Sequence, residues 1–145
     1  MSNTVQFACK ISTTDPQVPL ALEILLDGAS VFKNSHVEQD INVEFAISDD
    51  EAKRRLEFVL SGKTPAFTQI DSAGNIVKDA LLTISEITID EIELDNFVFD
   101  IAKYTHNFNG NGQSVEQKFF GNVGCNGTVT FDFSTPIYLW LLENL

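Results

Sequence analysis

Apolar and polar residues alternate along most of this chain, a pattern that few folds can accommodate. Val5–Ile11, Leu20–Leu26, Ile41–Ile47 and Val129–Phe133 each place an apolar residue at every second position. Successive side chains of a β-strand point to opposite faces, so each of these segments has one face to bury. The 12 phenylalanines also favour strands. We therefore expect a mostly β chain.

Turn signals separate these segments. Asp27-Gly28 lies between two apolar runs and predicts a tight hairpin. The spacing of apolar residues changes near Ser85-Glu86 and again near Asp90-Glu91, which indicates a bulge or corner at each place. Phe97–Phe108 is expected to form a strand that pairs with Val115–Phe120 across a glycine- and asparagine-rich turn.

The last ten residues differ from the rest because Pro136–Leu145 is nearly continuous apolar sequence. Such a run fits a buried strand or a short docked helix. About eight to ten short strands with no long helical pattern predict an all-β fold, a single antiparallel β-sandwich of jelly-roll type, with a short C-terminal helix as an alternative for the last segment. The length of 145 residues suits one domain, residues 1–145.

Charge narrows the range of partners. The sequence holds 21 Asp and Glu against 9 Lys and Arg, a formal net charge of −12. This acidic surface repels phosphate backbones and anionic lipid, so nucleic acid and membrane are not expected as partners. Cys9 and Cys125 have no metal-binding or redox spacing, and either two free thiols or one disulfide would fit.

The first residues lack the basic and apolar regions of a secretory signal, and no run reaches the length of a membrane span. From this we expect a protein that is cytoplasmic as synthesised.

Catalytic motifs are hard to place. His36 and His106 are the only histidines, and neither accompanies a nucleophile motif. So many Asp and Glu are present that a choice of any carboxylate pair carries no information. We therefore expect a protein that is not an enzyme.

Two surfaces are candidates for binding. Asp71, Asn75 and Asp79 form the most compact set of oxygen ligands, which would suit Ca²⁺, although a turn capped by Asp71 explains them without a metal. Tyr104, His106 and Asn109 lie at one predicted hairpin end and could form a polar, aromatic-edged surface.

Two stretches carry a resemblance to known proteins. Leu22–Phe32, followed by an alternating strand to Ile47, resembles the Leu-Asp-Gly strand pair of calcium-dependent xylan-binding-type carbohydrate modules. The segments Tyr104–Gly110, Phe119–Gly127 and Tyr138–Glu143 look like small proteins of marine bacteriophages and bacteria. The resemblance implies a β-sandwich of the carbohydrate-module type. If the likeness to phage proteins holds, this sandwich would be carried on a virion.

The leading hypothesis is a non-catalytic module that binds a glycan or protein partner, most concretely a carbohydrate. Asp27, Tyr104, His106 and Asn109 are the candidate ligand-binding residues. No cofactor other than Ca²⁺ is suggested. The alternative is a structural component of a phage particle, as a capsid decoration or tail protein, or another homo-oligomer that assembles through the apolar segment Ile137–Leu145.

Overall fold

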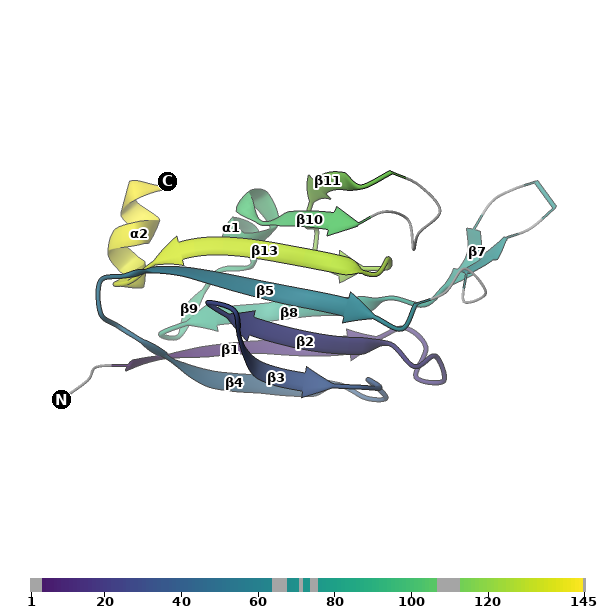
Figure 1. The fold of residues 1–145 in the computed structure, drawn as a ribbon, viewed down its shortest axis with the longest axis horizontal. Coiled ribbons are helices and arrows are strands. Elements are labelled where there is room, and N and C mark those ends of the chain that lie inside the picture. Colours follow the sequence, from purple (N-terminus) through teal and green to yellow (C-terminus); the bar gives the residue numbers. More distant parts are fainter. Residues whose placement is uncertain (1–3, 64–67, 71, 74–75, 107–112, 145) are drawn as a thin grey trace.

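The structure, a computed structural model, describes residues 4–63, 68–70, 72–73, 76–106 and 113–144. Strands predominate, and two short helices lie in the second half of the chain (Figure 1). The elements in chain order are β1 (Thr4–Thr13), β2 (Ala21–Leu26), β3 (Ala29–Asn34), β4 (Ile41–Ser48), β5 (Lys53–Ser61), β6 (Thr68–Ile70), β7 (Ile76–Asp79), β8 (Leu82–Ile89), β9 (Ile92–Glu93), α1 (Asp95–Ile101), β10 (Lys103–His106), β11 (Val115–Lys118), β12 (Asn122–Val123), β13 (Gly127–Ser134) and α2 (Ile137–Glu143).

Two antiparallel sheets form the body of the fold. One has the strand order β12-β8-β1-β4, with β9 paired to β8, and the other has the order β11-β10-β13-β5-β2-β3. Strands β6 and β7 pair separately and project from one end of the molecule (Figure 1). The predicted all-β class and antiparallel sandwich are confirmed.

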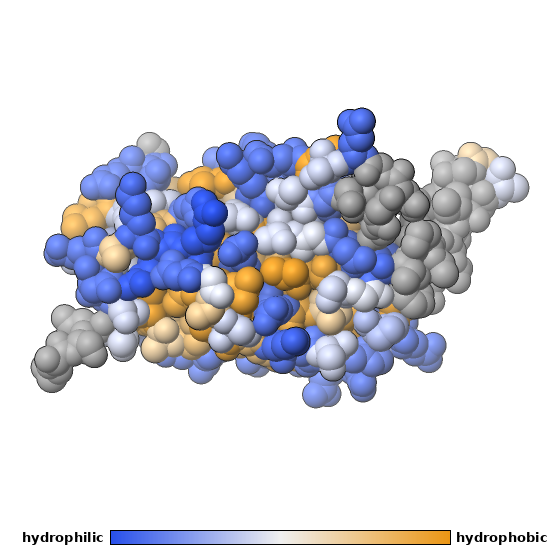
Figure 2. All heavy atoms as spheres, viewed as in Figure 1, coloured by the Kyte–Doolittle hydropathy of each residue, from blue (hydrophilic) through white to orange (hydrophobic). Residues whose placement is uncertain are grey.

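Alternation along the strands builds the core between the sheets. Phe7, Cys9 and Ile11 of β1 are buried, as are Phe58 of β5 and Phe131 of β13. The rings of Phe7 and Phe58 lie 6.4 Å apart and join one sheet to the other. The buried residues form one continuous cluster. On the outside, Figure 2 shows mostly hydrophilic side chains with apolar atoms between them.

The predicted corners are present. Asp27 (φ 51°) and Gly28 (φ 85°) make the tight turn between β2 and β3. Glu86 (φ 52°) lies where the pairing of β8 with β1 shifts register, and Asp90 and Glu91 both have positive φ in the β8–β9 turn. Each corner allows the next apolar residues to return to the core.

The expected strand at Phe97–Phe108 is wrong in its first part, because Asp95–Ile101 forms helix α1. The two carboxylate oxygens of Asp95 accept hydrogen bonds from the backbone N–H groups of Glu86 (3.1 Å) and Ile87 (2.7 Å). These bonds tie the start of the helix to the bulge in β8 and turn Val98 into the core. Tertiary contacts therefore override the local preference of the phenylalanine-rich segment.

The C-terminal segment forms the short docked helix, α2, which was one of its two expected forms. Ile137 and Trp140 are buried against the core. Cys9 and Cys125 are both free thiols, so the disulfide alternative is not realised in this structure.

Candidate functional site

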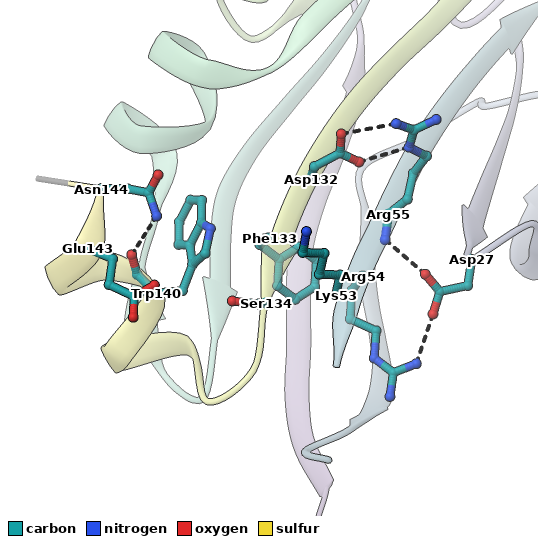
Figure 3. A pocket seen from close by; sticks show the side chains of 10 residues that line it. All are labelled: Asp27, Lys53, Arg54, Arg55, Asp132, Phe133, Ser134, Trp140, Glu143 and Asn144. Atoms are coloured by element: carbon teal, nitrogen blue, oxygen red, sulfur yellow. Dashed lines mark hydrogen bonds and ion pairs between the residues drawn. The ribbon is translucent and has the colours of Figure 1, made fainter. Parts of the chain in front are cut away.

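A cleft of about 570 Å³ opens where α2 meets the ends of β5 and β13 and the β2–β3 turn (Figure 3). Ligand sites in proteins typically have volumes of roughly 300–1,000 Å³. The lining residues are Asp27, Lys53, Arg54, Arg55, Asp132, Phe133, Ser134, Trp140, Glu143 and Asn144.

The pairing register of β5 with β13 determines which side chains form the floor of the cleft. Antiparallel pairing sets Lys53 opposite Ser134 and Arg55 opposite Asp132. Cross-strand partners share a face, and positions two apart along a strand share it too, so these four side chains lie on the outer face of the sheet. Phe133 lies between them in sequence and is buried on the inner face. Figure 2 shows strongly hydrophilic side chains over these strand ends, beside α2.

The two arginines are held by carboxylates. Arg54 donates from Nη1 to Asp27 Oδ2 over 2.8 Å and from Nη2 to Asp50 Oδ1 over 2.5 Å. Arg55 donates from Nε and Nη2 to the two oxygens of Asp132, over 2.8 and 3.1 Å. Bidentate pairing of this kind fixes a guanidinium in one orientation. The positive charge of each arginine is thus already matched within the protein.

Asp27 is an ionised partner of Arg54. Partial burial raises the pKa of its carboxyl, but hydrogen bonds from the Arg54 side chain and the Arg55 backbone N–H, together with the charge of Arg54, outweigh this and lower the pKa below its ordinary value. A general acid that works near neutral pH needs a raised pKa. Asp27 is therefore suited to organising the cleft and not to donating a proton.

Trp140 forms the apolar wall on α2. Its ring meets Phe131 edge to face with centroids 5.5 Å apart and lies 6.1 Å from Phe97. Only 9% of the residue is exposed. The nitrogen edge of the indole is turned toward Phe133 (Figure 3), and among the described residues its N–H has no hydrogen-bond partner. The Trp140 nitrogen is not one of the buried polar atoms that lack a partner, so its N–H can reach solvent or a ligand in the cleft.

Other polar side chains around the cleft also have unused hydrogen-bonding capacity. Within the described part of the chain, the side chains of Lys53, Ser134 and Glu143 make no hydrogen bond or ion pair. Asn144 donates from its amide nitrogen to the Trp140 carbonyl over 2.7 Å, which leaves its amide oxygen available. The described lining of the cleft therefore offers a ligand the donors of Lys53 and the indole, the acceptors of Glu143 and Asn144, and a serine hydroxyl that can act as either.

Of the ligand-binding residues predicted from sequence, Asp27 lines this cleft. Tyr104 and His106 are buried, with the Tyr104 hydroxyl donating to the Cys125 carbonyl and His106 Nε2 lying 3.1 Å from Gln117 Oε1. His106 lies level with Leu60, five positions along β5 from Arg55, which corresponds to roughly 16 Å of strand. The structure thus separates Asp27 from this pair.

The remaining predicted residues fall outside what the structure describes. Asn109, Asp71 and Asn75 lie outside the described residues, and Asp79 is described only in its backbone, as part of β7. Within the described side chains, no group of three or more His, Cys, Asp or Glu is arranged to hold a metal ion. Calcium binding by Asp71, Asn75 and Asp79 stays a prediction.

The outer face of α2 leaves apolar side chains exposed. Tyr138, Leu139 and Leu142 are 55%, 48% and 66% exposed. Self-association through the C-terminal segment, and a role in a phage particle, stay predictions, and light scattering would test the first. No helix among the described residues has the length and apolar character needed to cross a membrane.

Sequence reasoning missed most of the cleft. The one feature of the sequence that could have indicated the cleft is the run Lys53-Arg54-Arg55, which contains both arginines of this acidic chain. Trp140 is the single tryptophan of the chain, and no local feature of the sequence places it beside β5.

Comparison with known proteins gives little detail. No family model matches the sequence, and no curated protein matches it. Two solved structures are similar: vCBM60 in complex with galactobiose (TM-score 0.49, 10% identity, 87% of this chain and 96% of that one) and a selenomethionine form of vCBM60 (TM-score 0.49, 10% identity, 88% and 89%). The second structure links two families of calcium-dependent carbohydrate-binding modules by circular permutation. The sandwich described above stands on the strand pairing of this chain itself.

Proposed function

We propose that this chain is a non-catalytic binding module whose ligand is a carbohydrate, held in the cleft between α2, β5, β13 and the β2–β3 turn. The observation that carries the proposal is the set of polar groups around an indole that have no partner among the described residues: the Trp140 N–H, the Ser134 hydroxyl, Lys53, Glu143 and the Asn144 amide oxygen.

A saccharide suits this set because each sugar hydroxyl both donates and accepts hydrogen bonds. At the α2 wall, Glu143 and the Asn144 amide oxygen can accept from hydroxyls and the indole N–H can donate, while Lys53 donates to hydroxyls above the strands. Ser134 can do either. A hydrogen bond from a sugar hydroxyl to one of these groups replaces a hydrogen bond to water and contributes about 0.5–1.5 kcal/mol, so several of them together give specificity.

The rigid frame supports binding without catalysis. The half-buried pair Arg54–Asp27 holds the β2–β3 turn against β5 in advance, which reduces the entropy lost when a ligand binds. The Asp27 carboxylate already serves as an ion-pair partner and has a lowered pKa, so it is not poised to protonate a leaving group.

The single tryptophan supplies a direct test. Its emission reports on the cleft, so plant and algal oligosaccharides can be titrated while fluorescence is followed, with calorimetry to measure affinity. Ser134→Ala and Glu143→Gln should weaken binding by about 5- to 10-fold each, the loss expected for one hydrogen bond. Glu93→Gln is the matched control, since Glu93 is exposed on β9 away from the cleft.

Each titration is run with Ca²⁺ and with chelator, which also tests the predicted calcium site. Saccharide binding that shifts the emission of Trp140 and weakens in both cleft variants supports the proposal. A broad panel that gives no binding in either condition, or binding that is unaffected by both variants, would refute it.

A further inference from the structure

We infer that the saccharide carries a carboxylate, as a uronic acid does, and that Lys53 recognises this acid group. The inference rests on the proposed function, because it assigns a ligand class to the same cleft.

Lys53 is the cation in the described cleft whose charge is not already matched. Arg54 is paired with Asp27 and Asp50, and Arg55 with Asp132. Lys53 is exposed, and among the described residues no carboxylate lies within 4.0 Å of its ammonium group. Its place at the first position of β5 sets it opposite Ser134 and beside the cleft floor (Figure 3).

An unmatched lysine is unusual in this chain because acidic residues outnumber basic ones 21 to 9. The side chains of Lys10, Lys103 and Lys118 each form an ion pair. Lys33 on β3 also lacks a partner among the described residues, but it does not line the cleft. Lys53 combines a free charge with a place in a cavity.

A carboxylate is the acid group that fits these surroundings. Ammonium-to-carboxylate hydrogen bonds are roughly twice as strong as neutral ones, and the Ser134 hydroxyl is a further donor on the same face as Lys53. Glu143 on the opposite wall carries a negative charge, unmatched within the described residues, that accepts from sugar hydroxyls and disfavours a second anion.

The net charge of −12 on the whole protein also disfavours the binding of a second anion. At 0.15 M salt the Debye length is about 8 Å, so the repulsion of distant carboxylates is largely screened while a contact at Lys53 persists. Densely charged polyanions meet more of the acidic surface than a short uronic oligosaccharide does. The cleft therefore suits one carboxylate close to Lys53.

The test uses two ligands that differ at a single carboxylate, glucuronosyl-xylotriose and its methyl ester. Calorimetry at 0.15 M salt should show that the unaltered protein binds the acid on the order of 10-fold more tightly than the ester. Lys53→Met should bind both ligands with the affinity of the ester. Lys33→Met, which removes the same charge outside the cleft, should keep the preference.

Equal affinity of the unaltered protein for acid and ester, or a preference that survives in Lys53→Met, would overturn this inference. If neutral oligosaccharides still bind in either case, the proposed function stands without it. Failure of every saccharide, charged or neutral, would remove the proposed function and this inference together.

Discussion

Arg54 Nη1 lies 2.8 Å from Asp27 Oδ2, and this ion pair ties the β2–β3 turn to the beginning of β5. Asp27 also accepts the backbone N–H of Arg55 with its other oxygen, over 2.8 Å. One side chain, at a turn position with positive φ, thus holds a wall of the cleft against the strand that carries Lys53.

The Asp27 contact should make stability depend on pH. The folded-state pKa of Asp27 is lowered from its ordinary 3.8, so its contribution is fully present above about pH 4 and is lost as pH falls through the lower folded-state value. Asp27→Asn removes the charge but tolerates positive φ. We expect it to lower the free energy of unfolding by about 1 kcal/mol at pH 7, with a smaller difference at pH 3. Urea denaturation at pH 7 and pH 3 measures this difference in unfolding free energy, and an equal difference at the two pH values would contradict the prediction.

The β8–β9 turn should be improved by glycine. Glu91 has a φ of 64°, a conformation that glycine adopts without steric cost. Glu91→Gly should therefore raise the free energy of unfolding by about 0.5–1 kcal/mol. Glu91→Ala is the matched control, because it removes the same charge and keeps the Cβ. Equal effects of the two variants in thermal denaturation would show that charge, and not backbone conformation, is responsible.

Replacement of Gly127 by any residue with a side chain should destabilise the fold. A Cβ at this position would lie 2.2 Å from the Thr105 carbonyl oxygen and 2.9 Å from His106 Cβ. Gly127→Ala must push β10 away from β13, and we expect a loss of about 2–3 kcal/mol in unfolding free energy. At Gly28 nothing lies within 4 Å of an added Cβ, so Gly28→Ala should cost only the backbone strain of its positive φ, about 1 kcal/mol. Similar losses in the two variants would count against the steric explanation.

Substitutions on the two faces of α2 should have very different effects on the free energy of unfolding. Trp140 packs on Phe131 and Phe97, so Trp140→Ala should cost about 3–5 kcal/mol. Leu142 on the same helix is 66% exposed, and Leu142→Ala should change stability by less than about 0.5 kcal/mol. Guanidinium denaturation followed by circular dichroism compares them without the tryptophan signal. A small loss for Trp140→Ala would mean that α2 is not docked as described.

The two thiols should react at very different rates. Desolvation by burial, with a further contribution from the charge of Asp95, raises the pKa of Cys9 to about 12. The thiolate is the reactive form, so Cys9 should resist a disulfide reagent at pH 8 while the half-buried Cys125 reacts. Cys125→Ser should leave the native protein unlabelled and show one reactive thiol in denaturant. Fast labelling of that native variant would disprove the prediction.

The sequence predicted the strands that have one buried face, because alternation there reports directly on burial. The corner at Glu86 and the turn at Asp27-Gly28 were also visible, since a change of period and a turn dipeptide are local signals. Helix α1 was not, because Phe97, Phe99 and Ile101 alternate as a strand would. Its geometry depends on Asp95 binding the backbone of β8, which is a tertiary contact.

The cleft could be predicted only in part for the same reason. Asp27 was identified as a candidate, but Arg55 and Asp132 are 77 residues apart in sequence. Their meeting requires the register of β5 with β13, and the position of Trp140 requires the return of α2 after that strand. A single sequence carries no local signal for either relationship.

Strand β13 lies between β10 and β5 in the middle of its sheet, although it comes last in chain order among the described strands. During synthesis, at about 5–20 residues per second, β5 therefore presents an unpaired edge for several seconds before residues 127–134 emerge. Folding cannot be completed from the N-terminus outward, because the central insertion comes last. Pairing over such long separations is slow, so refolding should take milliseconds to seconds, and stopped-flow emission of Trp140 would follow the closing step directly.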